Sequence, residues 1–99
     1  MAKKKIKYNP SIFEGQDDIY CAECGSTQYV TRHEIFFGND RDRSKHWGCW
    51  INLCSACHDK LHFGKSKTLK VKWQRECQKK FEELYGHKKF MFVFRKNYL

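Results

Sequence analysis

The sequence predicts a small α+β domain that is stapled by a four-cysteine zinc site and carries an amphipathic helix near its C-terminus. A chain of 99 residues supplies material for one hydrophobic core. Its cysteines include two Cys-x-x-Cys pairs, and its middle segments alternate between strand-forming and helix-forming patterns. Its later residues repeat apolar side chains every three or four positions. These observations predict the zinc site, the mixed elements and the helix, respectively.

The chain divides into four parts within a single domain of residues 1–99. Residues 1–19 are expected to form a basic, irregular N-terminal arm, because they contain the only proline and show no sustained periodicity. Residues 20–63 carry the cysteine pairs and a succession of strand, loop, strand and helix. Residues 67–86 are expected to form the C-terminal helix, and residues 87–99 an aromatic tail.

The elements of the central part follow from residue types and turn signals. β-Branched and aromatic residues predict a strand over 29–37, and the short apolar run 49–54 predicts a second strand that pairs with it. The polar, glycine-bounded residues 38–48 predict a loop. One helical turn after Asp40 is an alternative for part of this loop. Ser55 is expected to be the N-cap of a short helix that Gly64 ends.

The C-terminal helix is predicted by an apolar stripe that Gly86 closes. The aromatic tail must bury one or more of its phenylalanines, either as a short strand or as one helical turn. The stripe consists of Leu69, Trp73, Cys77, Phe81, Leu84 and Tyr85, and the tail phenylalanines are Phe90, Phe92 and Phe94.

The charge of the chain favours an anionic partner. Lys and Arg number 20 against 11 Asp and Glu, which gives a formal charge of +9. Nucleic acid is the default partner for such a balance, and a merely soluble basic protein is the alternative. No apolar run approaches the ~20 residues of a membrane span, and no apolar segment follows the basic start as in a secretory signal. We expect no membrane partner and a cytoplasmic setting, in a bacterium or a phage-infected host cell.

The two cysteine pairs predict one structural zinc site. Each Cys-x-x-Cys knuckle, Cys21/Cys24 and Cys54/Cys57, points two thiolates at a shared centre, and zinc suits four soft thiolates. The spacer between the knuckles is longer than the usual ~15–20 residues, because it holds the strand, loop and strand. Cys49 and Cys77 lie outside the pattern and are expected to be small buried apolar side chains.

Three histidines need a separate explanation. His58 and His62 lie at positions i and i+4 of the proposed helix, so both imidazoles project from one face. Histidines in this arrangement can share a metal ion. His58 and His62 therefore predict a metal site of their own; the alternative, in which His58 completes the zinc shell, is unnecessary with four thiolates available.

These residues together resemble a known family. The segments "RHEIFFG" and "WINLCSACHDKLH", with "CAEC" upstream, are similar to HNH endonucleases of the ββα-metal type, most of all to small phage-encoded HNH proteins. The resemblance covers residues 21–63 by motif and extends more loosely to the C-terminus. It implies a ββα-metal, treble-clef-like core and a metal-dependent endonuclease or nickase that hydrolyses DNA phosphodiester bonds.

The resemblance also implies roles for single residues. His58 and His62 would bind the catalytic metal. One residue of the pair His33 and Glu34 would activate water and the other would lie at the metal; the suitable pKa of histidine favours His33 as the base. The catalytic ion would be Mg²⁺, Mn²⁺, Ni²⁺, Co²⁺ or Zn²⁺, with imidazoles favouring the later four. Cys49 stands where the family has its middle asparagine. Asn52 is the nearest candidate, and Asn39 and Asp40 in the loop are the alternatives.

Basic residues flank the predicted site and are expected to contact the phosphates of double-stranded DNA with weak sequence preference. A phage protein is a possible further partner. The alternative functions are a non-catalytic zinc module that binds nucleic acid or protein, and an HNH fold without activity. The expected phosphate contacts are Arg32, Arg41, Arg43, Lys45, Lys60, Lys65 and Lys67.

Overall fold

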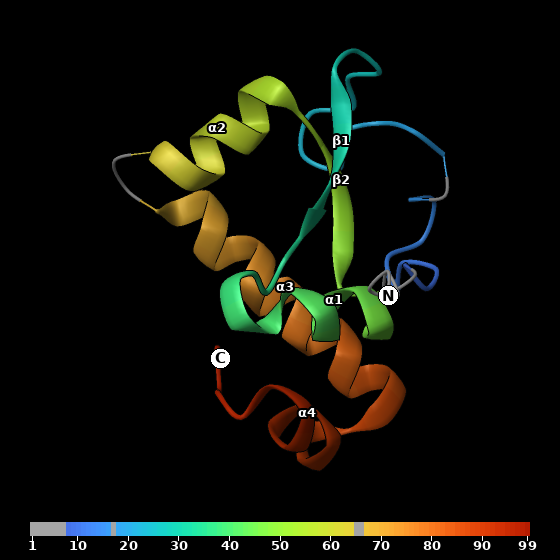
Figure 1. Ribbon diagram of the computed structural model, residues 1–99, viewed down its shortest axis with the longest axis vertical. Helices are drawn as coiled ribbons and strands as arrows, with labels where there is room; N and C mark the ends of the chain where they lie inside the picture. The colour runs from blue at the N-terminus through green and yellow to red at the C-terminus, as the bar shows by residue number, and fades with distance from the viewer. Residues whose placement is uncertain (1–7, 17, 65–66) are drawn as a thin grey trace, which may run out of the picture.

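A two-stranded sheet with helices around it organises the molecule (Figure 1). The computed structural model describes residues 8–16, 18–64 and 67–99, so the expected DNA contact Lys65 and the start of the arm lie outside the described residues. The elements in chain order are β1 (Val30–Glu34), the 3-10 helix η1 (Gly38–Asp40), α1 (Arg41–Trp47), β2 (Trp50–Cys54), α2 (Ser55–Phe63), α3 (Thr68–Tyr85) and α4 (His87–Phe94).

Strands β1 and β2 pair antiparallel, as the sequence predicts, and their register decides which side chains share a face. His33 pairs with Ile51, and Arg32 pairs with Asn52. Directly opposed residues point to the same face, and neighbours along a strand point to opposite faces. His33 and Ile51 therefore lie on one face of the sheet, whereas Arg32, Asn52 and Glu34 lie on the other.

Residues 38–48, predicted to be a loop, are helical over most of their length. Helix α1 covers Arg41–Trp47 and ends at Gly48, whose φ of 71° provides the left-handed cap. Ser44 of α1 is fully buried, and its hydroxyl donates to the carbonyl oxygen of Phe36 at 2.6 Å. The polar composition indicated a loop because this buried serine, which ties the helix to the end of β1, is invisible in a hydrophobicity pattern.

Helices α2 and α3 agree with the predicted ranges, with one shift at the start of α2. Ser55 is the first helical residue and Cys54 holds the N-cap position, so the assignment of Ser55 as N-cap is wrong by one residue. Cys54 takes the extended backbone of a cap because it ends β2, while the Ser55 N–H donates to the carbonyl oxygen of Tyr29 at 3.0 Å. Within the described ranges, no helix is long and apolar enough to cross a membrane.

The aromatic tail forms α4, which is longer than a single turn and is not a strand. Phe90 and Phe94 are buried one turn apart and close on Phe36, with ring centroids 5.5 and 4.6 Å from it. Phe92 points away from this core and is 77% exposed. An alternating strand pattern and a helical pattern were indistinguishable in this run because nearly every residue is apolar.

Residues 8–16, called the N-terminal segment from here on, cover the face of the sheet opposite α2 (Figure 1). The backbone of this segment is irregular, as predicted, yet it is well anchored. The indole N–H of Trp50 donates to the carbonyl oxygen of Asn9 at 2.7 Å, and the amide N–H of Ile12 donates to that of Gly48 at 3.0 Å. With one face under this segment and the other under helices, every residue of β2 is buried.

Candidate functional site

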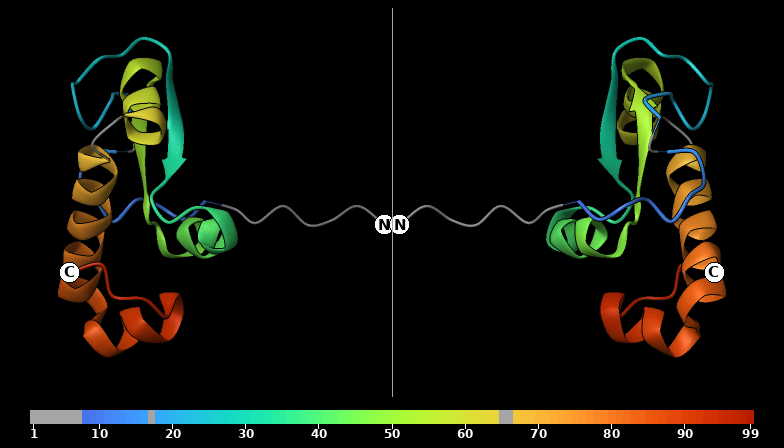
Figure 2. Two further views of the ribbon diagram at one scale, coloured as in Figure 1. Left: turned by 90° about the vertical axis from the view of Figure 1, so that its left-hand side faces the viewer. Right: turned by 90° about the vertical axis from the view of Figure 1, so that its right-hand side faces the viewer.

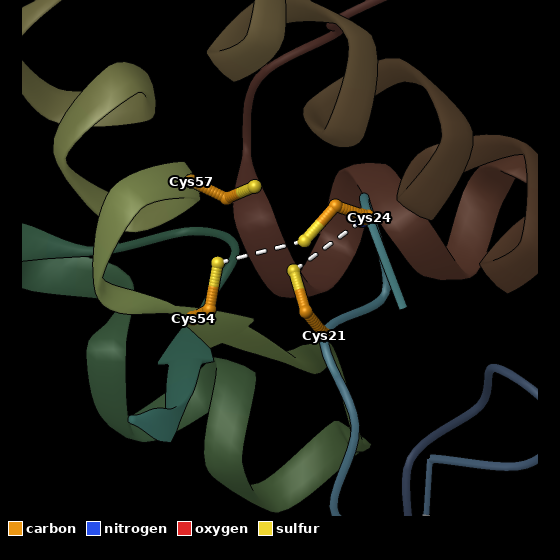
Figure 3. A group of neighbouring side chains, drawn as sticks. All are labelled: Cys21, Cys24, Cys54 and Cys57. Carbon is orange, nitrogen blue, oxygen red and sulfur yellow. Dashed lines mark hydrogen bonds between the residues drawn. The ribbon is translucent and has the colours of Figure 1, made fainter. Parts of the chain in front are cut away.

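The four cysteines of the two knuckles meet at one point (Figure 3). Cys21 and Cys24 come from the turn before β1, Cys54 ends β2, and Cys57 lies in the first turn of α2. Their sulfur atoms all lie within 4.8 Å of one another. Segments that are 30 residues apart in sequence are thus joined at a single centre.

The first knuckle has the backbone geometry that directs two sulfurs inward. The Gly25 N–H donates to the carbonyl oxygen of Cys21 at 2.8 Å, with Gly25 at φ 80°. Burial acts to raise the pKa of Cys21, but backbone N–H groups, including those of Cys54 and Cys24, outweigh it and lower this pKa to about 6. These N–H groups stabilise the thiolate, which is the form that binds a metal.

The donor set and spacing fit a metal ion such as zinc. Zn–S bonds of about 2.3 Å place the sulfurs of a tetrahedral site about 3.8 Å apart. The Cys24 and Cys54 sulfurs are already 3.6 Å apart, and no two of the four sulfurs are more than 4.8 Å apart. Cys49 and Cys77 take no part in this cluster and are fully buried in the core, where burial raises the pKa of Cys77.

A second cluster joins His33 of β1 to His58 and His62 of α2. One ring nitrogen of each residue lies within 4.8 Å of the others. The ring centroid of His33 lies 5.2 Å from that of His58 and 5.2 Å from that of His62. The centroids of His58 and His62 are 4.5 Å apart. His33 is buried, His58 half-buried and His62 exposed, so the cluster opens from the sheet toward the solvent. Three imidazoles with an open side can hold a divalent cation and leave it accessible.

The surroundings favour the neutral form of two of these imidazoles, His33 and His62. Burial, followed by the charges of His58 and His62, lowers the pKa of His33 to about 3. Burial, His58 and Lys70 lower the pKa of His62, while Asp59 opposes them. A neutral imidazole is the form that donates its lone pair to a metal ion.

Glu34, the other residue of the predicted pair, does not join the histidines. It lies on the opposite face of the sheet, where its Oε1 accepts a hydrogen bond from the Tyr8 hydroxyl at 2.9 Å. Lys45 is 3.8 Å from the same oxygen. Glu34 is therefore part of the contact between the sheet and the N-terminal segment.

Asn52 also lies on that opposite face, and its predicted catalytic role does not fit its contacts. Its side-chain amide donates to the carbonyl oxygens of Gln16 at 2.9 Å and Asp18 at 3.3 Å. Its backbone N–H donates to the Gln16 side chain at 2.7 Å. Asn52 fixes the chain just before the first knuckle, which is a structural role at a distance from the histidines.

The basic residues expected to contact DNA are spread over several surfaces. The Arg32 guanidinium lies over the rings of Tyr8 and Trp50, at 4.6 and 4.5 Å, on the face opposite the histidines. Arg43 forms an ion pair with Asp40 at 2.6 Å. The others named from sequence are placed as follows: Lys45 beside Tyr8, Arg41 exposed on α1, Lys60 exposed on α2 and Lys67 exposed just before α3.

Lys70, which the sequence did not single out, is the cation placed beside the histidine cluster. Its Nζ lies 5.1 Å from the centroid of Phe37, and the Phe37 ring is 5.1 Å from that of His62. Its charge acts directly on His62. The only sequence signal was its place in the first turn of the predicted C-terminal helix, and that signal did not show that this turn returns to α2.

No protein-family model, curated protein or solved structure gives a significant match to this chain. A function must therefore be argued from the two side-chain clusters and their surroundings.

Proposed function

We propose that the protein is a metal-dependent endonuclease of the HNH type that hydrolyses phosphodiester bonds in DNA. The observation that carries the proposal is the convergence of His33, His58 and His62 beside a separate four-cysteine cluster. A module that needed only a structural metal would be complete with the four cysteines, which we propose to bind zinc. The additional imidazoles, open to solvent on one side, suit a second ion that contacts substrate.

In this proposal His33 is a metal ligand along with His58 and His62. Its ring faces the other two, and a pKa of about 3 makes it a weak base at neutral pH. This assignment differs from the sequence preference for His33 as the base and takes up the alternative, in which His33 lies at the metal. Glu34 would need to leave its Tyr8 contact to act on water.

A divalent cation bound by the three imidazoles would neutralise charge on the scissile phosphate and lower the pKa of a coordinated water molecule. Because imidazole nitrogen suits Mn²⁺, Co²⁺, Ni²⁺ and Zn²⁺ better than Mg²⁺, we expect the first group to bind more tightly.

DNA is the proposed substrate because the chain carries a formal charge of +9 and a cation stands beside the cluster. Lys70 is positioned to contact a phosphate of a strand that reaches His62, since its charge already acts on that imidazole. The dispersed arrangement of the other cations supports salt-sensitive binding with weak sequence preference.

A second candidate function is a non-catalytic zinc module, or an HNH fold without activity, that binds nucleic acid. The observation in its favour is that Glu34 and Asn52 both face away from the histidine cluster. Neither the carboxylate nor the amide that the family resemblance implies is in place to assist hydrolysis.

Plasmid cleavage with added Mn²⁺ or Mg²⁺ separates the two candidates. The proposal expects His58→Ala and His62→Ala to abolish cleavage while the fold and the zinc content remain. His87→Ala is the matched control, because His87 is 57% exposed on α4 and pairs with Glu82. If neither the parent nor any variant cleaves the plasmid with any divalent metal, the second candidate, a non-catalytic module that binds nucleic acid, is the function.

A further inference from the structure

A hollow lined by aromatic and basic residues lies between α1 and the end of α4. Helix α4 lies at the end of the molecule away from α2 (Figure 1). The hollow has a volume of about 260 Å³ and is lined by Arg43, Trp47, Phe92, Val93 and Arg95. Phe92 is 77% exposed, although its neighbours Val93 and Phe94 are buried in the core. Phe92 and Trp47 together give the hollow two aromatic side chains in its lining.

Cations surround this aromatic surface. Lys89 lies over both rings, with its Nζ 5.3 Å from the centroid of Trp47 and 5.9 Å from that of Phe92. Within the part of the chain that the structure describes, no carboxylate pairs with Lys89 or Arg95, whereas Arg43 is held by Asp40. None of the lining residues is acidic.

We propose that this hollow is a binding site for unpaired nucleotides of single-stranded DNA. A base stacked on Phe92 gains contact with an aromatic face, and Lys89 and Arg95 are in position to neutralise the flanking phosphates. Duplex DNA does not offer a free base face, so the site selects unpaired strands. Helix α2 lies at the other end of the longest axis, which measures 39 Å (Figures 1 and 2).

The inference extends the proposed function, because a strand held here and at His62 would run along the molecule, but the binding itself needs no catalysis. The test is fluorescence anisotropy with a labelled oligothymidylate of about 10 nucleotides, and with a duplex of the same length. Phe92→Ala should weaken oligothymidylate binding about tenfold and leave duplex binding unchanged. Ile19→Ala, which removes a side chain that is 71% exposed elsewhere, is the control and should change neither.

The salt dependence of oligothymidylate binding distinguishes the stacking contact of Phe92 from the charge contact of Lys89. Phe92→Ala should leave the slope of log K against log salt as it is, whereas Lys89→Ala should reduce it by about 0.7, the contribution of one phosphate on a single strand. Circular dichroism should show both variants folded, because both side chains are exposed and alanine favours helix.

Titrations without added divalent metal distinguish this inference from the proposed nuclease activity. The parent should bind oligothymidylate under these conditions, and Phe92→Ala should bind it about tenfold more weakly, although no cleavage takes place. Equal affinity of Phe92→Ala and the parent for oligothymidylate overturns the inference, whatever the cleavage result. So does Phe92-dependent binding of polyglutamate in place of DNA, or a Phe92-dependent dimer in solution, since either identifies a different occupant.

Discussion

Cys57 and His58 are consecutive residues of α2, yet their side chains belong to two different clusters, one of sulfur and one of imidazole. Residues that are neighbours along a helix point about 100° apart, so one turn can serve two centres. The sulfur cluster fixes the start of α2 against β2 and the first knuckle. The imidazole cluster depends on that placement, because His58 and His62 meet His33 only when α2 lies across the sheet.

The order of dependence between the clusters can be tested by metal analysis. If the cysteines bind zinc as proposed, Cys57→Ser should release it, unfold the domain and abolish binding of the proposed second metal, because a structural zinc supplies folding free energy. His58→Ala should lose only the second metal. Elemental analysis and calorimetric titration with Mn²⁺ or Co²⁺ measure both.

Cys77→Ala is the control for that experiment, because Cys77 is fully buried but outside the sulfur cluster. It should lower the melting temperature and keep the zinc. Loss of the cysteine-bound zinc from His58→Ala would show that the two sets of ligands are divided incorrectly.

Lys70→Ala should reduce DNA binding and cleavage while the second metal still binds. The expected change is a decrease of about 1 in the slope of log K against log salt for duplex DNA, as for the loss of one phosphate contact. Lys79→Ala on the same helix is the matched control, because Lys79 is paired with Glu76 and its side chain is 55% exposed. If the two variants change DNA binding equally, Lys70 contributes only through the overall positive charge of the protein.

The sequence predicted the features that depend on local spacing and missed those that depend on tertiary contacts. The cysteine and histidine intervals identified the four cysteines and the pair His58 and His62, because i+3 and i+4 spacing fixes direction within a turn or helix. His33 was named only through the family resemblance, which favoured it as the base. The face occupied by Glu34 and Asn52 depended on the strand register, which opposed side chains in the folded sheet determine. Lys70 could not be recognised because its proximity to His62 arises where α3 returns toward α2.

Asn52→Ala should destabilise the protein by about 1–3 kcal/mol, because it leaves the buried carbonyl group of Gln16 without its side-chain donor. Its amide donates to Gln16 and Asp18, and Asn52 itself is only 5% exposed. Cleavage and metal affinity should persist under conditions in which the variant is folded. Urea denaturation gives the free energy, and Asn39→Ala, at an exposed position, is the control. Lost cleavage at unchanged stability would restore Asn52 to a catalytic role.

Two glycines of similar backbone geometry test how strongly the N-terminal segment is held against the sheet. Gly38 and Gly48 have φ of 70° and 71°, so alanine at either position carries a strain of about 1–2 kcal/mol. A Cβ at Gly38 meets nothing within 4 Å, whereas one at Gly48 collides with the carbonyl oxygen of Pro10.

Gly48→Ala should therefore lower the free energy of unfolding by about 1–3 kcal/mol more than Gly38→Ala, because the backbone of the segment must move. Denaturant melts of both variants give the difference, and limited proteolysis should cut Gly48→Ala earlier near residue 10. Equal destabilisation by the two substitutions would mean that the N-terminal segment moves away from residue 48 at little cost in free energy. The contacts of Trp50 with Asn9 and of Asn52 with Gln16 would then contribute little to stability.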